Sequence, residues 1–199
     1  MRPRPNKRDF IVSEATRLFY ERGTGLGVDT LVEEIGVAKM TIYKHFRTKD
    51  DLIVACLRHV DGRYRERLQA GIVEDADPIE KILGIFDSLG DWFAKPNFRG
   101  CAFVNAAVEI ADPSHPARQA VLDHKRHTRE WVSELVDECD IEDSYFVTRQ
   151  IVQLMEGAVT SAFVENDPSA ALVARRTAEQ VLWFARDRQS NSIGRSRAS

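Results

Sequence analysis

Cysteines are few in this chain of 199 residues, and long apolar runs and secretion signals are missing. Cys56, Cys101 and Cys139 are odd in number, widely spaced and without a Cys-x-x-Cys pair, so a disulfide framework is not expected. No apolar stretch approaches the roughly 20 residues that cross a bilayer. The basic N-terminus lacks the apolar segment of a signal peptide. We therefore expect a cytoplasmic protein that makes no membrane contact.

Catalytic and metal-binding patterns are equally scarce. The sequence shows no Ser/His/Asp arrangement and no glycine-rich loop that would hold a phosphate. His124 and His127 stand three residues apart on an expected helix, but the neighbouring Lys125, Arg126 and Arg129 disfavour a divalent cation. The sequence therefore predicts no catalytic residue, no metal ligand and no cofactor.

Charge is distributed unevenly along the chain. The net charge of −3 at pH 7 hides a basic N-terminal quarter, where residues 1–50 hold ten Lys and Arg against seven Asp and Glu. The remainder holds 18 basic against 24 acidic residues. This asymmetry indicates that the N-terminal part contacts a polyanion such as nucleic acid.

The spacing of apolar residues is helical nearly throughout, and no region has the sequence pattern of β-strands. Asn6 is a suitable cap for a first helix, which Gly23 ends. We expect further helices at about 28–35, 39–46, 48–71, 78–93, 100–110, 116–139, 143–166 and 169–188. The polar segment 189–199 is expected to be a disordered tail.

The segment after Gly36 carries the strongest functional signal. Ile42 and Phe46 stand four residues apart, so they share one buried face of a short helix. The rest of this helix consists largely of side chains that can form hydrogen bonds, among them Lys39, Thr41, Tyr43, Lys44 and His45. Two short helices joined by a turn containing glycine form a helix-turn-helix, and the second of them fits a DNA major groove.

A family resemblance rests on the same segment. Residues 36–46 read Gly-Val-Ala-Lys-Met-Thr-Ile-Tyr-Lys-His-Phe and are followed by Lys49-Asp50-Asp51-Leu52. Over residues 10–57 this arrangement resembles the tetracycline-repressor (TetR) family of bacterial transcriptional regulators. The resemblance implies an all-α fold with an N-terminal three-helix, helix-turn-helix DNA-binding domain (1–48) and a C-terminal helical ligand-binding and dimerisation domain (49–188), before the tail at 189–199.

The resemblance also implies which residues touch DNA. The positions that match Lys39, Met40 and Thr41 face bases in the family, and those that match Tyr43, His45 and Lys49 hold phosphates; Lys44 is a further phosphate candidate.

Three departures from the family pattern affect this interface. Met40 replaces a frequent glycine and could present a flexible apolar surface to a thymine methyl group. Ala38 stands where the family usually has the Ser or Thr that caps the third helix. Asp29, near the start of the second helix, occupies a position that often faces DNA, where a carboxylate either accepts from cytosine N4 or repels phosphate.

In the family the C-terminal domain binds a small molecule, so we looked for side chains that could line a partly apolar pocket. Asn105 and Glu109 are polar, stand four residues apart in an apolar segment, and could orient such an effector. A structural hydrogen bond or a surface pair is the alternative for both. The predicted pocket residues are Phe86, Trp92, Phe103, Asn105, Glu109, Trp131 and Met155.

Dimerisation through the last two helices is implied by the family, and an apolar face in the sequence agrees with it. In the first of these helices the face comprises Ile151, Leu154, Met155, Ala158, Val159, Ala162 and Phe163; in the last it comprises Leu172, Val173, Val181, Leu182 and Phe184.

We therefore predict a one-component regulator, most simply a repressor that binds a palindromic operator as a homodimer and is released by a small molecule. The alternative is a helical enzyme or small-molecule-binding protein whose N-terminal helices are only structural.

Overall fold

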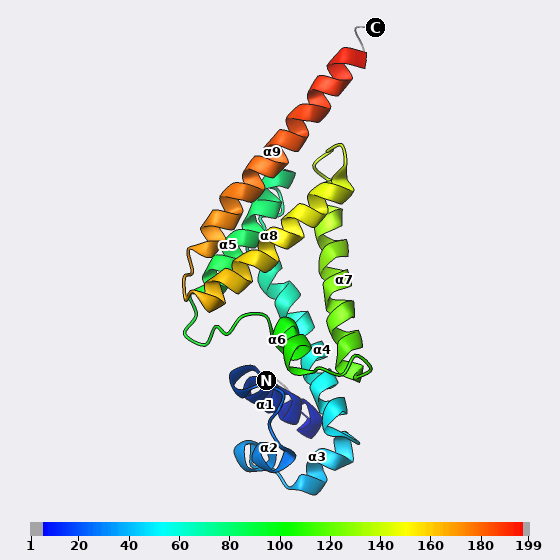
Figure 1. Cartoon of the computed structure of the whole chain (residues 1–199), viewed down its shortest axis with the longest axis vertical. Coiled ribbons are helices and arrows are strands. Elements are labelled where there is room, and N and C mark those ends of the chain that lie inside the picture. Colours follow the sequence, from blue (N-terminus) through cyan, green and yellow to red (C-terminus); the bar gives the residue numbers. More distant parts are fainter. Residues whose placement is uncertain (1–5, 197–199) are drawn as a thin grey trace. The chain divides into compact units, whose positions relative to one another are not determined.

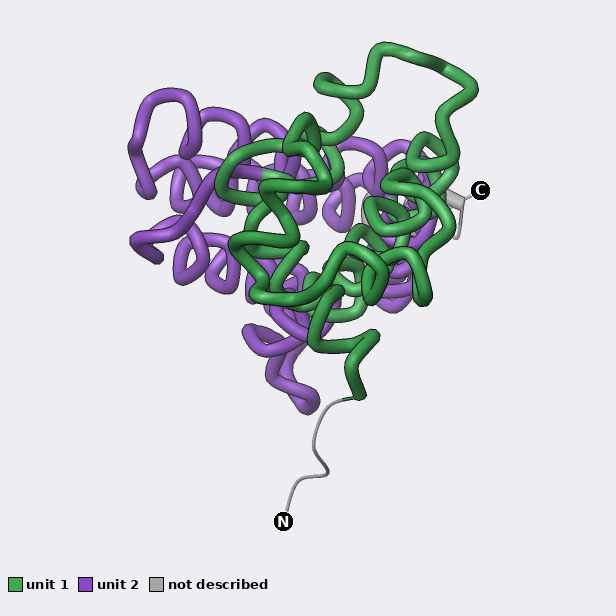
Figure 2. Tube along the Cα trace, turned by 90° about the horizontal axis from the view of Figure 1, so that it is seen from below, with its two compact units in different colours: residues 1–64, 101–124 green, residues 65–100, 125–199 purple. Residues whose placement is uncertain are grey.

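The computed structural model describes residues 6–196, with side chains described up to residue 188. These residues form helices and connecting turns without a strand, so the predicted all-α fold is confirmed. They divide into two compact units, residues 6–64 with 101–124 and residues 65–100 with 125–196 (Figure 2). The helices, labelled in Figure 1, are α1 (Lys7–Arg22), α2 (Val28–Ile35), α3 (Lys39–His45), α4 (Lys49–Gln69), α5 (Pro78–Phe93), α6 (Ala102–Glu109), α7 (Pro116–Asp137), α8 (Ser144–Val164) and α9 (Ala170–Ser196).

Local sequence signals account for where the first helices begin and end. The Asn6 side chain accepts a hydrogen bond of 2.9 Å from the Asp9 N–H at the start of α1, as predicted. Gly23 ends α1 with φ of 87°, and Gly36 ends α2 with φ of 69°. Both values lie in a region that L side chains rarely adopt, which explains glycine at these two turns.

The first unit is built around one apolar core. Helix α1 contributes Ile11, Ala15 and Leu18, and α2 contributes Leu31. Helices α6 and α7 also reach this core, because Phe103, Ala106, Ala117 and Val121 are buried in it. The compact units therefore do not follow the boundary we expected at residues 48 and 49, and α4 and α7 each contribute residues to both units.

The second unit is held together by contacts among α5, α8 and α9. Helix α5 is almost entirely apolar on its inner faces, where Ile79, Ile82, Leu83 and Phe86 are fully buried. Helix α8 supplies its own apolar face to this core. Part of the predicted dimer face is therefore wrong, because the following residues are buried within the chain: Ile151, Met155, Ala158, Val159, Ala162 and Leu182.

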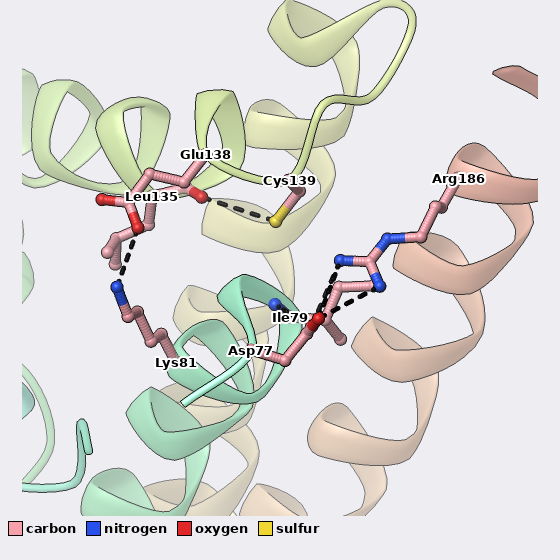
Figure 3. A network of polar contacts seen from close by, with 7 residues as sticks. All are labelled: Asp77, Ile79, Lys81, Leu135, Glu138, Cys139 and Arg186. Carbon is pink, nitrogen blue, oxygen red and sulfur yellow. Dashed lines mark hydrogen bonds and ion pairs between the residues drawn. The ribbon is translucent and has the colours of Figure 1, made fainter. Parts of the chain in front are cut away.

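Polar contacts fix the start of α5 to its neighbours in the same unit (Figure 3). The Asp77 carboxylate accepts from the Ile79 N–H at 2.9 Å and from the guanidinium of Arg186 on α9 at 3.1 Å. The hydrogen bond from Arg186 lowers the pKa of Asp77 below its ordinary value. One turn along α5, the ammonium of Lys81 lies 2.9 Å from Glu138, beside the end of α7.

The C-terminal segment differs from expectation. Helix α9 continues through Ser196, so residues 189–196 are helical where we predicted a disordered tail; residues 197–199 lie outside the described part of the chain. A helix already fixed by packing needs no new nucleus, because each added residue gains one hydrogen bond. A polar sequence can therefore extend it. Within residues 6–196 no helix is both long and apolar enough to cross a membrane.

Gly71 and Gly84 let two backbones approach closely in the second unit. A Cβ on Gly84, in α5, would collide with the carbonyl oxygen of Gly71, in the turn after α4. A Cβ on Gly71 would collide with the carbonyl oxygen of Gly84 in the same way. Since both obstacles are backbone atoms, they cannot move aside as a flexible side chain would.

We predict that Gly84→Ala lowers the free energy of unfolding by about 2 kcal/mol, because the inserted methyl group forces the two segments apart. Urea denaturation measures this change. The matched control is Gly62→Ala in α4, where an added Cβ has nothing within 4 Å. That substitution should stabilise the protein by about 0.5–1 kcal/mol, because alanine is the better helix former. Equal stability of the two variants would contradict the close approach.

Candidate nucleic-acid interface

Gly36 begins the turn between α2 and α3. The Gly36 N–H donates to the Val32 carbonyl oxygen at 3.0 Å, which closes the end of α2. Val37 then turns into the core, and α3 begins at Lys39. Ala38 precedes it without a side-chain cap, the consequence expected of alanine at this position. The predicted helix-turn-helix is therefore present.

The register of α3 is the one that the sequence predicted. Ile42 is 2% exposed and Phe46, directly after the helix, is 3% exposed, so both are in the core of the first unit. Because these two side chains anchor one face of α3, the remaining face of the helix is turned away from the core. The orientation of this short helix thus depends on a pair of apolar residues.

The outward face of α3 carries the residues predicted to contact DNA. Met40 is 78% exposed although it is apolar, and Lys39, Tyr43 and Lys44 are exposed too. Thr41 and His45 are partly buried at the edges of this face, and so is Lys49 at the first residue of α4. Side chains that line a shallow open concavity on this surface are Met40, Thr41, Tyr43 and Lys44.

An ion pair joins the starts of α2 and α3. The ammonium nitrogen of Lys39 lies 2.7 Å from Oδ1 of Asp29, which is in the first turn of α2. The hydrogen bond and the negative charge of Asp29 raise the pKa of Lys39 above its ordinary value. The sequence marked Asp29 as a departure from the family pattern but did not predict that it binds Lys39.

The start of α4 is fixed by a reciprocal cap. The Asp51 N–H donates to the Thr48 hydroxyl at 3.1 Å, and the Thr48 N–H donates to the Asp51 carboxylate at 3.0 Å. The pair holds Lys49 at a helix N-terminus, where the backbone N–H groups favour an anion such as phosphate.

The residues predicted to form an effector pocket are divided between the two compact units. Phe86 and Trp92 of α5 and Met155 of α8 are buried in the second unit, where Trp131 of α7 is half-buried. The other three, Phe103, Asn105 and Glu109, belong to α6 in the first unit. Asn105 and Glu109 line a cavity of about 30 Å³ with residues of α1 and α4, and none of the other five takes part in it. This volume suits a water molecule rather than an effector.

Glu109 ties α6 to the turn that precedes α2. Its carboxylate accepts from both the backbone N–H and the hydroxyl of Thr24. It also lies so close to Gly23 that a Cβ there would be 3.0 Å from a carboxylate oxygen. Of the two interpretations left open by the sequence, these contacts favour the structural hydrogen bond for Glu109.

A buried histidine joins three helices of the first unit. His124 of α7 is 3% exposed, and its ring stacks on that of Phe103 with centroids 3.6 Å apart. Its Nδ1 is 2.7 Å from the carboxylate of Asp61 on α4, and the ring of Tyr64 meets its edge. This cluster was not predicted from the sequence. A signal was present, because Asp61 stands four residues after the buried Leu57 and so shares its face of α4. In the described residues no group of three His, Cys, Asp or Glu side chains could hold a metal ion.

Comparison with known proteins agrees with this geometry. Residues 11–56 match the model of the tetR family of bacterial regulatory proteins, and residues 78–178 match that of the tetracyclin repressor-like C-terminal domain. The HTH-type transcriptional regulator YjdC of Escherichia coli K12 is 22% identical over 94% of this chain and 99% of its own length. The E. coli repressor NemR is 28% identical over 57% of this chain and 59% of its own length.

A solved structure is similar over nearly the whole fold. A TetR-family transcriptional regulator from Streptomyces coelicolor superposes with a TM-score of 0.83 at 32% identity, over 90% of this chain and 95% of the other. These matches cover both the N-terminal helices and the C-terminal ones. They exclude the alternative of an enzyme with merely structural N-terminal helices. The chain belongs to the TetR family of bacterial transcriptional regulators.

Proposed function

We propose that this regulator is a repressor that binds a palindromic operator as a homodimer and leaves it when a partly apolar small molecule binds. The observation that carries the proposal is the division of α3 into a buried face, Ile42 and Phe46, and an outward face of potential DNA-contacting side chains. Operator DNA lies in the bacterial cytoplasm, so the proposal also assigns the protein to that compartment.

Each DNA contact has its own chemical role in the proposal. Lys39 donates to guanine O6 or N7, Thr41 bonds a base edge, and the exposed thioether of Met40 contacts a thymine methyl group. A second group positions the helix by binding phosphates without reading sequence. These residues are Tyr43, Lys44 and His45 of α3, and Lys49 at the N-terminus of α4.

Repression is favoured by the name of one relative, since NemR is a repressor. Family members act as dimers, and the outer faces of α8 and α9 support this assembly here. Large apolar side chains remain exposed on these outer faces, whereas the inner faces of both helices are buried within the chain. The exposed ones are Tyr145, Phe146, Phe163 and Val164 of α8, and Leu172, Val173, Trp183 and Phe184 of α9. Because these helices lie in contact, two copies would form a four-helix interface.

Effector binding has to alter the position of the DNA-reading helices. Phe86, Trp92 and Met155 are buried in the second unit, so an effector that contacts them must open the packing between its helices. Trp131 is a further contact proposed in this unit, and Phe103, Asn105 and Glu109 are contacts proposed separately in the first unit. A displacement of α6 would act on the turn before α2 through the bonds from Thr24 to Glu109.

Helix α4 offers a second route for this coupling. It begins at the Thr48–Asp51 cap directly after α3, and its Asp61 is bonded to His124 of α7. A shift of α7 at this pair would therefore move the helix that follows the recognition helix. The differential affinity that such coupling requires is about 1–3 kcal/mol.

Substitution of two lysines tests the DNA contacts. We expect Lys39→Ala to alter base preference at one position of each half-site, because it removes a donor to a base edge. Lys49→Ala should instead weaken binding to all sequences alike and reduce the salt slope by about one, because it removes a phosphate contact. Gel shifts with DNA upstream of the protein's own gene, over a range of salt concentrations, measure both.

Lys95→Ala is the matched control for these variants, since Lys95 is an exposed lysine of the second unit. It should bind like the wild type. Identical behaviour of all three variants would contradict the assignment of α3 and the start of α4 as the DNA-binding surface.

The dimer interface is tested by placing a charge on α9. Phe184 is 66% exposed in the single chain, so Phe184→Glu should leave the monomer folded and should disrupt a dimer that buries this ring. Sedimentation equilibrium measures the assembly. Leu122→Glu on α7, at a residue 62% exposed, is the control and should remain dimeric. A dimeric Phe184→Glu variant would exclude this face.

The coupling at Glu109 is tested by amide exchange. Glu109→Ala removes the carboxylate oxygen that accepts both hydrogen bonds from Thr24, so the Thr24 amide should exchange with solvent faster than in the wild type. Glu109→Gln keeps one carbonyl oxygen and should preserve most of the protection. Hydrogen–deuterium exchange measures the rate for the Thr24 amide. Equal rates in the wild type and both variants would show that the contact with Glu109 does not hold the turn.

A further inference from the structure

We propose that Asp29 is a second base-reading residue, and that Asp29 and Lys39 together read one G·C base pair in each half of the operator. This inference rests on the proposed DNA binding of α3. It adds an acidic residue of α2 to the contacts and states which base pair the combined group recognises.

The first support is the geometry of the pair. Asp29 is in the first turn of α2 and Lys39 is the first residue of α3, so the two helix starts meet at this contact. Their charged atoms are 2.7 Å apart. The Asp29 side chain is 85% exposed and that of Lys39 is 51% exposed, so the pair is open to an approaching duplex. A donor and an acceptor are thus presented side by side.

The second support is the match to the major-groove edge of a G·C pair. Guanine presents two acceptors, N7 and O6, and cytosine presents the N4 amino donor beside them. O6 and N4 are joined by a base-pairing hydrogen bond, so they are about 3 Å apart, close to the separation of the two protein atoms. An ammonium has three hydrogens. One can stay on Asp29 while the others reach N7 and O6, and the carboxylate accepts from N4.

An A·T pair is the nearest competitor and fits less well. It also has a donor beside an acceptor, since adenine N6 lies next to thymine O4. Its acceptor on that side is a single oxygen flanked by the thymine methyl group, so Lys39 would gain one bond where guanine offers two. The preference should therefore be for G·C, with the guanine on the Lys39 side.

A structural role could also explain an aspartate at position 29, and the test must distinguish that role from base reading. A carboxylate in the first turn of a helix is stabilised by the helix dipole whether or not it meets DNA. If Asp29 faced phosphates in the complex, its charge would weaken binding to every sequence equally. Base reading predicts a change at one base pair; repulsion predicts a uniform change.

The experiment is selection from a random duplex library with the full-length dimeric protein, followed by affinity measurement on single-base variants of the selected site. The wild type should enrich a G·C pair at one fixed position of each half-site. In Asp29→Asn the preference for G·C over other base pairs at that position should fall roughly tenfold. The base preferences at the other positions of the half-site should stay as in the wild type. Lys39→Met should lose it at the same position, and the double variant should lose no more than Lys39→Met does.

Glu34→Gln is the matched control. Glu34 is also on α2 and forms an exposed ion pair, 2.7 Å from Arg22, but it lies at the other end of the helix. This variant removes the same charge and should keep the preference at that position. Thermal unfolding of each variant confirms that it is folded.

Three results would overturn the inference. Asp29→Asn could bind all sequences more tightly with unchanged preference, or the two variants could act at different positions, or the wild type could select A·T at the shared position. Failure of the wild type to enrich any sequence would instead contradict the proposed DNA binding itself, and this inference with it.

Discussion

Burial of Ile42 and Phe46 is the contact on which the DNA-binding surface depends. Helix α3 has seven residues, too few to be stable alone in water. Its apolar pair in the core of the first unit both stabilises it and sets its rotation about its own axis. Every outward side chain takes its direction from that rotation, so a change of register by one residue would turn Lys39 away from a duplex.

Around this core, a few polar contacts fix the ends of helices and the turns between them. Ala38 gives α3 no side-chain cap, whereas the reciprocal Thr48–Asp51 cap fixes the start of the next helix, α4. The bonds from Thr24 to Glu109 then link α6 to the turn before α2. In both places a polar side chain accepts a hydrogen bond from a backbone N–H that has no partner within a helix.

Part of this arrangement was predictable because its causes are local. Asn6, Gly23 and Gly36 are signals of helix ends that act within a few residues, and all three do so in the structure. The apolar spacing predicted the buried face of α3 for the same reason. The predicted end of α9 was wrong, because polar composition was taken to indicate disorder. A helix anchored by packing can extend into polar sequence.

Other features depend on partners that are distant in sequence. From the sequence Glu109 could orient an effector or form a structural bond, and its contact with Thr24, 85 residues away, favours the bond. The apolar face of α8 suggested a dimer contact, but α8 buries Ile151 and Met155 inside its own chain. Periodicity shows that a face is apolar; it does not identify the surface that covers it.

The sequence by itself determined the all-α fold, the helix-turn-helix and the side chains that α3 turns outward. Helix periodicity and end signals act over one or two turns, so the residues alone carry that information. Only the tertiary structure decided that Asp29 binds Lys39 and that His124 stacks on Phe103 against Asp61. Those contacts form between separate helices, and packing of the whole unit brings them together.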